Sequence, residues 1–319
     1  MTPRENFIHF LKNEPCEWTP TSADQCFFRP AAIPDNIARA MVQQQVPYEG
    51  EWGGKDMFGV EWVYVPTVGG SMETGIMFED IEDWKKYVKI PDPDSIDWEG
   101  CAKANAEYLN TDKILYSTIY TGYFERLISF VGFESSAMAL IDEDEQELVH
   151  ELFQKLTDYY IEIIRRMKKY FNIEIVEVHD DWGNQRSLMF SVNTHKEMIV
   201  PYMQQITKAA HEMGVFIEMH SCGKIEGLMP NLIDTGVDTW RGQASVIDKK
   251  FCVDNYGDRF KFGVEIRPES PLPTDEAMAL ADKILADYHG KNVWIILGRT
   301  LGAEASDLIY KKIRAMGRI

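Results

Sequence analysis

The residues with the clearest chemical potential are His220 and Cys222, which are separated by one residue in the segment Val215-Phe-Ile-Glu-Met-His-Ser-Cys-Gly-Lys224. The apolar start of this segment predicts a short buried strand, and alternate side chains of a strand point to the same face. An imidazole and a thiol side by side at a strand end supply half of a zinc site. Glu218 lies on the same face, one step deeper. The alternative is that both are ordinary buried residues.

Composition restricts the class of protein. The chain has 319 residues, of which 45% are hydrophobic and 26% charged, as is typical of a globular protein. No apolar run is long enough to cross a bilayer, so we expect no membrane contact. The net charge of −18 disfavours nucleic acid as a partner. The start of the chain lacks a signal-peptide pattern and the five cysteines form no CxxC pair, so we expect a cytoplasmic protein with reduced thiols.

Predicted strands and helices alternate along most of the chain. The expected strands are 18–25, 114–119, 173–178, 215–223, 237–243, 260–266 and 293–297. The expected helices are 5–12, 35–45, 81–88, 98–109, 143–170, 194–213, 225–235, 247–256, 274–288 and 304–316, with Thr194 and Thr274 as caps. Such βα units predict an α/β fold with a parallel sheet, and their number favours a (β/α)8 TIM barrel over a doubly wound open sheet, because no GxGxxG follows the first strand.

We expect residues 1–319 to form a single domain. The range 50–95 is rich in glycine and aromatic residues and contains a predicted hairpin strand at 59–65, so it is interpreted as an N-terminal insertion, or lid, near the barrel mouth.

In a barrel, the carboxyl ends of the strands meet at one mouth, which is where active sites are built. The polar and aromatic residues expected there are Asp24, Gln25, Tyr120, Tyr123, His179, Asp180, Asp181, Trp182, His220, Cys222, Arg241, Gln243, Glu265, Arg267, Arg299 and Thr300. Several have structural alternatives. One of Asp180 and Asp181 would cap a loop, Glu265 and Arg267 would form an ion pair on the rim, and Tyr120 and Trp182 would pack.

Five stretches resemble the uroporphyrinogen decarboxylase superfamily: Asp180-Asp-Trp-Gly-Asn-Gln185, the capped helix through Pro201, Met219-His-Ser-Cys-Gly223, Gly236-Val-Asp238 and the range 80–91. The resemblance implies a (β/α)8 barrel of one of two kinds. One kind decarboxylates uroporphyrinogen without a cofactor, and the other transfers methyl groups to or from a corrinoid protein, often with zinc. The arginine-rich segment that grips porphyrinogen carboxylates is missing from residues 23–30, which favours the second kind.

The resemblance therefore implies a methyltransferase, the O-demethylase component that moves a methyl group from a small methylated substrate, an aryl methyl ether, to the cob(I)alamin of a corrinoid partner protein. The alternatives are a decarboxylase and a non-catalytic corrinoid- or ligand-binding relative. In this interpretation Asp181, Asp180 and His220 are catalytic. Substrate contacts are expected from Tyr120, Trp182, Gln243, Arg267 and Arg299.

The expected metal is zinc, held by His220 and Cys222. Cobalamin-dependent relatives add a second cysteine after the last strand, but Arg299 occupies that place here. A catalytic zinc needs three protein ligands, so a carboxylate must complete the set. Glu265 is our prediction for this ligand and Asp181 is the alternative. Glu218 is less suitable because it lies two residues deeper than His220.

Overall fold

The computed structural model describes residues 1–67 and 70–317. These residues fall into two compact units. The central unit comprises Phe27–Thr111 and Leu115–Val237, and the terminal unit comprises Met1–Cys26, Asp112–Ile114 and the chain from Asp238 onward. In the described part of the chain, no helix is both long and apolar enough to cross a membrane.

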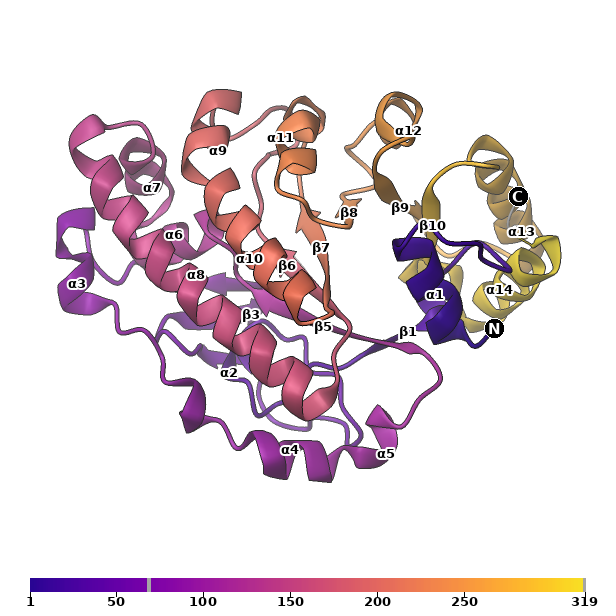
Figure 1. Ribbon diagram of the computed structural model, residues 1–319, viewed down its shortest axis with the longest axis horizontal. Helices are drawn as coiled ribbons and strands as arrows, with labels where there is room; N and C mark the ends of the chain where they lie inside the picture. The colour runs from indigo at the N-terminus through magenta and orange to yellow at the C-terminus, as the bar shows by residue number, and fades with distance from the viewer. Residues whose placement is uncertain (68–69, 318–319) are drawn as a thin grey trace. The chain divides into compact units, whose positions relative to one another are not determined.

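The central unit contains three parallel strands in the order β5 (Ile114–Tyr120), β6 (Ile175–His179) and β7 (Phe216–Ser221). Their backbones are buried, as expected for strands covered on both faces. Helices α8 (Glu143–Phe171) and α10 (Val200–Glu212) connect consecutive strands and lie side by side (Figure 1). The strand–helix alternation and the parallel pairing confirm the predicted α/β class.

Helix α8 shows how the sequence fixes an element. Its first turn is acidic and its last turn basic, which complements the helix dipole. Asp142 caps the start by accepting the N–H of Asp144 at 2.9 Å, and Asn172 ends the helix in the left-handed conformation. The predicted range of 143–170 is therefore correct to within one residue.

Residues 53–67 and 70–73 contain an antiparallel sheet with strands β2 (Gly53–Lys55), β3 (Glu61–Val65) and β4 (Gly70–Glu73). The hairpin strand predicted at 59–65 corresponds to β3. This sheet contacts helix α2 (Pro34–Ala38). The segment thus departs from the parallel framework as expected, while its action as a lid stays a prediction.

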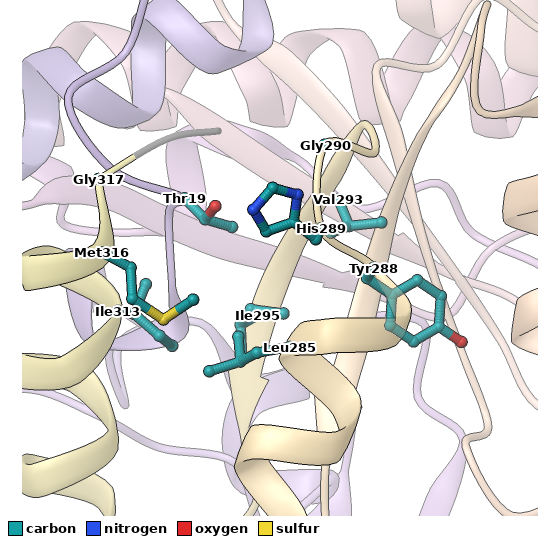
Figure 2. Close-up of a pocket in the computed structure, with 10 residues that line it drawn as sticks. All are labelled: Thr19, Leu285, Tyr288, His289, Gly290, Val293, Ile295, Ile313, Met316 and Gly317. Atoms are coloured by element: carbon teal, nitrogen blue, oxygen red, sulfur yellow. The ribbon is translucent and has the colours of Figure 1, made fainter.

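The terminal unit repeats the parallel pattern with β8 (Thr239–Gly242), β9 (Lys261–Ile266) and β10 (Val293–Leu297). Helices α12 (Lys249–Tyr256), α13 (Thr274–Asp287) and α14 (Ala303–Met316) follow the strands, and α1 (Pro3–Leu11) packs Phe7 against Trp294. A pocket in this unit lies among Val293 and Ile295 of β10 and the ends of α13 and α14 (Figure 2). Val293 begins β10, so the pocket is at the amino end of the strand.

The remaining elements are short. They are β1 (Gln25–Phe27), α3 (Trp84–Tyr87), α4 (Trp98–Ala104), α5 (Ala106–Leu109), α6 (Phe124–Val131), α7 (Phe133–Ala139), α9 (Val192–Met198), α11 (Met229–Asp234) and the 3-10 turns Ser22–Asp24, Ile81–Asp83, Pro93–Ser95, Glu226–Leu228 and Arg299–Leu301. The closed eight-stranded barrel and the single domain stay predictions.

Several boundaries differ from the sequence predictions. The helix expected at 194–213 begins at Val192, because Ser191 rather than Thr194 is the cap and accepts the N–H of Thr194 at 3.0 Å. It is divided before Val200, since Pro201 cannot donate a backbone hydrogen bond. Pro273, not Thr274, precedes α13. Of the first expected strand, 18–25, only Gln25 belongs to β1 (Gln25–Phe27), and Ser22–Asp24 form a 3-10 turn before it.

Candidate functional site

Three neighbouring strands of the central unit end in aromatic or imidazole side chains at the same level. The strand register places Tyr120 of β5 beside His179 of β6, and His179 beside His220 of β7. The ring centroids of Tyr120 and His179 are 5.3 Å apart, and those of His179 and His220 are 4.5 Å apart at an interplanar angle of 21°. Because the carboxyl ends of parallel strands meet at one edge, these rings form a row at the edge where α/β proteins build their sites.

The row of rings is bordered by groups that can bind a metal. One donor atom from each of His179, Asp181 and His220 lies within 4.8 Å of the other two. Cys222 adds a thiol 3.4 Å from His220 Nε2, and its backbone N–H donates to Asp181 Oδ1 at 2.6 Å. The structure therefore brings together three predicted site residues, His220, Cys222 and Asp181. It adds His179, which the sequence had placed at the mouth without a ligand role.

Below the imidazole rings is a buried polar layer. The hydroxyl of Tyr116 contacts Glu177 Oε2 at 2.6 Å and Glu218 Oε1 at 2.7 Å. Glu177 and Glu218 face each other in the register of β6 and β7, two residues before the histidines. Glu177 Oε1 lies 3.9 Å from His179 Nδ1, so this carboxylate faces the ring nitrogen that points away from Asp181. Glu218 thus contacts the Tyr116 hydroxyl beneath the histidine rings.

Asp180 is completely buried and holds the start of helix α6. Its carboxylate accepts the backbone N–H groups of Tyr123, Phe124 and Glu125 at 2.8–3.1 Å, and the indole N–H of Trp182 at 2.8 Å. Burial and the nearby Glu125 raise the pKa of Asp180 to about 7, against the opposing effect of these hydrogen bonds. This geometry agrees with the alternative given for Asp180 in the sequence analysis, which is that its carboxylate caps a neighbouring segment of backbone.

Trp182 packs in the same layer. Its side chain is fully buried and its ring meets His195 edge to face at 4.3 Å. The packing alternative describes Trp182, and Tyr120 is also buried, with its ring against that of His179.

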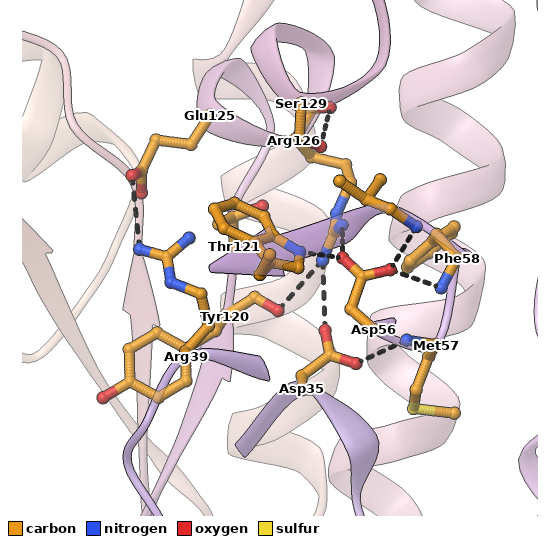
Figure 3. Close-up of polar contacts among 12 residues, drawn as sticks. Asp35, Arg39, Asp56, Met57, Phe58, Tyr120, Thr121, Glu125, Arg126 and Ser129 are labelled. Atoms are coloured by element: carbon orange, nitrogen blue, oxygen red, sulfur yellow. Dashed lines mark hydrogen bonds and ion pairs between the residues drawn. The ribbon is translucent and has the colours of Figure 1, made fainter. Parts of the chain in front are cut away.

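Two charged residues at the site, Glu125 and Arg39, were not predicted from the sequence. Glu125 Oε2 lies 3.7 Å from His179 Nε2, and Arg39 pairs with the other oxygen of Glu125 at 3.7 Å (Figure 3). The guanidinium of Arg39 stacks on Trp62 of β3 at 4.5 Å. Burial raises the pKa of Glu125, and Asp181 raises it further, while His179 and Arg39 lower it. Arg39 therefore connects the small antiparallel sheet to the site, because it contacts both Trp62 and Glu125.

Two glycines let the loops after β6 and β7 touch. A Cβ at Gly223 would lie 2.1 Å from the carbonyl carbon and oxygen of Gly183, and Gly223 has a φ of +80°. The Lys224 N–H donates to the Asn184 carbonyl at 2.8 Å and fastens the two loops together. The glycines of the DDWG and HSCG motifs thus set the spacing between Asp181 and Cys222.

The other predicted site residues belong to the terminal unit. Gln243 follows β8, Glu265 and Arg267 lie at the end of β9, and Arg299 follows β10. Glu265 and Arg267 face each other at 3.8 Å, which is the ion pair given as their alternative. Each of these residues lies at the carboxyl end of its strand, as predicted. Their roles in binding substrate or metal stay predictions.

The donor set suits a borderline metal such as zinc. Imidazole, thiolate and carboxylate are its usual ligands. Burial raises the pKa of the Cys222 thiol well above its ordinary value, and Asp181 and Glu125 raise it further, so the thiol is protonated unless a cation displaces the proton. A metal bound here can act as a Lewis acid on an oxygen of a substrate.

The chain has an α/β framework with a cluster of donor groups at the carboxyl ends of its strands. Many α/β enzymes share this arrangement, so it does not define one activity. Residues 57–250, more than half of the chain, match the family described as "Uroporphyrinogen decarboxylase (URO-D)". The chain belongs to this family.

Solved structures give the fold. A methyltransferase from Methanosarcina mazei is similar at a TM-score of 0.68 and 17% identity, with 99% of each chain covered. An AP endonuclease of family 2 from Brucella melitensis has a TM-score of only 0.39 at 10% identity, over 69% of this chain and 85% of that chain. None of the curated proteins compared with the chain matches it.

Proposed function

We propose that the protein is a corrinoid-dependent methyltransferase that moves a methyl group from a small methylated compound, an aryl methyl ether, to the cob(I)alamin of a partner protein. The observation that carries this proposal is the cluster of His179, Asp181, His220 and Cys222 beside an aromatic ring, Tyr120. Membership of the family and a fold similar to that of a methyltransferase support it. We also propose that the strands of both units form one (β/α)8 barrel.

The chemistry explains why such a cluster is needed. Cob(I)alamin attacks the methyl carbon, a C–Co bond forms, and the electron pair of the broken C–O bond stays on the aryl oxygen. An aryloxide is a poor leaving group unless its oxygen is protonated or bound to a cation. A zinc ion held by His220 and Cys222 with a carboxylate would supply this stabilisation.

The residues of the chain itself position the substrate. Tyr120 is 5% exposed and its ring lies next to His179, and we propose that it borders the bound aromatic ring. The guanidinium of Arg39 lies 5.6 Å from the same ring. If the substrate carries a carboxylate, Arg267 and Arg299 are its proposed partners by bidentate pairing, and Gln243 is a proposed polar contact.

The test is methyl transfer to free cob(I)alamin, measured by the absorbance change on methylcobalamin formation. We expect methylation with a methoxybenzoate, and its loss in His220→Ala. His211→Ala, which removes an exposed histidine from the last turn of helix α10, is the matched control and should retain activity. Decarboxylation of uroporphyrinogen together with no transfer from any methoxyaromatic would refute the proposal and favour the decarboxylase alternative.

A further inference from the structure

We infer that His179 and Asp181, from the end of β6, complete the metal site that His220 and Cys222 begin, so that all four donors come from the central unit. This inference rests on the proposed function, because it names the ligands of the metal that the proposed reaction would use. It replaces Glu265, our sequence prediction for the carboxylate, with Asp181, and it adds an imidazole.

The spacing of the donor atoms carries the inference. For zinc, bonds of about 2.0–2.1 Å to nitrogen and about 2.3 Å to sulfur at a tetrahedral angle place the two atoms about 3.5 Å apart. His220 Nε2 and Cys222 Sγ are 3.4 Å apart. His179 Nε2 and Asp181 Oδ1 are 4.0 Å apart, about 0.6 Å more than the roughly 3.4 Å that two such ligands need. The group whose donor atoms all lie within 4.8 Å of one another comprises His179, Asp181 and His220, so Cys222 and these side chains must move closer together on binding the metal.

The surroundings of His179 are those of a ligand. Metal-binding imidazoles commonly face a carboxylate with the ring nitrogen that does not bind the metal, and this carboxylate orients the ring. Glu177 faces His179 Nδ1 at 3.9 Å and is itself held by the Tyr116 hydroxyl at 2.6 Å. The opposite nitrogen, Nε2, faces Glu125 Oε2 at 3.7 Å and Asp181 Oδ1 at 4.0 Å.

Charge favours a cation at the same place. Three carboxylates, Glu125, Glu177 and Asp181, lie within 4.0 Å of the ring nitrogens of His179. Arg39 supplies one positive charge to this group through Glu125. A divalent cation at the ring nitrogens of the two imidazoles would offset the remaining negative charge in a half-buried setting, where attraction between charges is stronger than in water.

The donor types select the metal class. Two imidazoles, a carboxylate and a thiolate suit Zn²⁺ and Co²⁺, whereas Mg²⁺ and Ca²⁺ prefer sets of oxygen ligands. We therefore expect Mg²⁺ and Ca²⁺ not to bind tightly at this site.

The experiment measures metal binding without substrate. Metal-free protein is titrated with Zn²⁺ against a chromophoric chelator, and with Co²⁺ by absorption spectroscopy. Wild type should bind one equivalent. His179→Ala should bind at least about 100-fold more weakly, at or beyond the upper end of the 10–100-fold loss typical of an outer-sphere partner. Glu265→Gln, the matched control, should bind within about 2-fold of wild type.

Cobalt tests the thiol separately. Wild type should show the near-ultraviolet band of a thiolate bound to Co²⁺, and Cys222→Ser should lose it. Asp181→Asn keeps an acceptor for the Cys222 N–H but loses the charge, and it should also weaken binding; it answers the question if His179→Ala does not fold, as judged by circular dichroism.

Unchanged affinity in folded His179→Ala or in Asp181→Asn, or a large loss in Glu265→Gln, would overturn the inference. Because no turnover is involved, a protein that binds metal as described but transfers no methyl group would refute the proposed function alone.

Discussion

Arg126 holds together a buried charge cluster, and its removal gives a strong test of how the central unit is stabilised. The guanidinium is 1% exposed, and it contacts Asp56 Oδ2 at 2.5 Å, Asp35 Oδ1 at 3.1 Å and the carbonyl of Tyr120 at 3.1 Å (Figure 3). Arg126→Met keeps much of the volume but leaves two buried carboxylates without this cation. Breaking a buried ion pair from one side costs about 3–5 kcal/mol, so we expect a loss of that size at pH 7.

The pH dependence of this loss follows from Asp35. Burial, then the neighbouring Asp56, raise the pKa of Asp35 to about 6, while Arg126 lowers it. Removing Arg126 therefore raises this pKa further. A carboxyl whose pKa is higher in the folded state than in the unfolded state favours folding when it is protonated and costs stability as pH rises through its folded pKa. The deficit of Arg126→Met should shrink as pH falls from 8 to 5, by up to about 1.4 kcal/mol per pH unit.

Urea unfolding at pH 5, 7 and 8 measures both effects. A double-mutant cycle with Asp56→Asn gives the matched comparison, because neutralising the carboxylate first should make the later loss of Arg126 less costly. A deficit below 1 kcal/mol at pH 7, or a deficit that does not change between pH 5 and 8, would refute the reasoning.

Three further predictions concern single residues. Burial lowers the pKa of His195 to about 3, so protonation of this residue should remove about 2 kcal/mol of stability between pH 8 and 5, and His195→Phe should gain that amount relative to the wild type over this range in thermal unfolding; parallel profiles would contradict this. Asp180→Asn should cost about 2–3 kcal/mol in urea unfolding, because four N–H donors lose a charged acceptor, and a change under 0.5 kcal/mol would contradict it. Tyr120→Leu should raise KM for a methoxyaromatic substrate about 2–10-fold, as expected for a lost ring contact, with kcat little changed; an unaltered KM would remove Tyr120 from the substrate site.

The sequence predicted the parts of the site that depend on strand periodicity. The ends of β6 and β7 were placed to within a residue or two, so His179, Asp181, His220 and Cys222 could all be assigned to one edge. The long charged helix α8 was predicted equally well, because its caps and dipole-matching charges are local features.

Other features depend on contacts between residues far apart in the sequence. Glu125 lies in the first turn of α6 and approaches His179 because Asp180 binds the N–H groups of that turn, and Arg39 comes from the chain after α2. An acidic residue soon after a strand end was the only local signal for Glu125. Thr194 had the expected capping-box spacing, but Ser191 offered a cap one turn earlier.

The contact between Gly183 and Gly223 has a consequence for mutational surveys of the site. Neither glycine has a side chain that can bind a metal, yet a methyl group on Gly223 cannot fit without moving the loop that carries Asp181 away from the loop that carries Cys222. Gly223→Ala would therefore reduce metal binding while every donor remained in the chain. A survey that scores only loss of metal would count such a residue among the ligands, although its contribution is to the distance between two backbones.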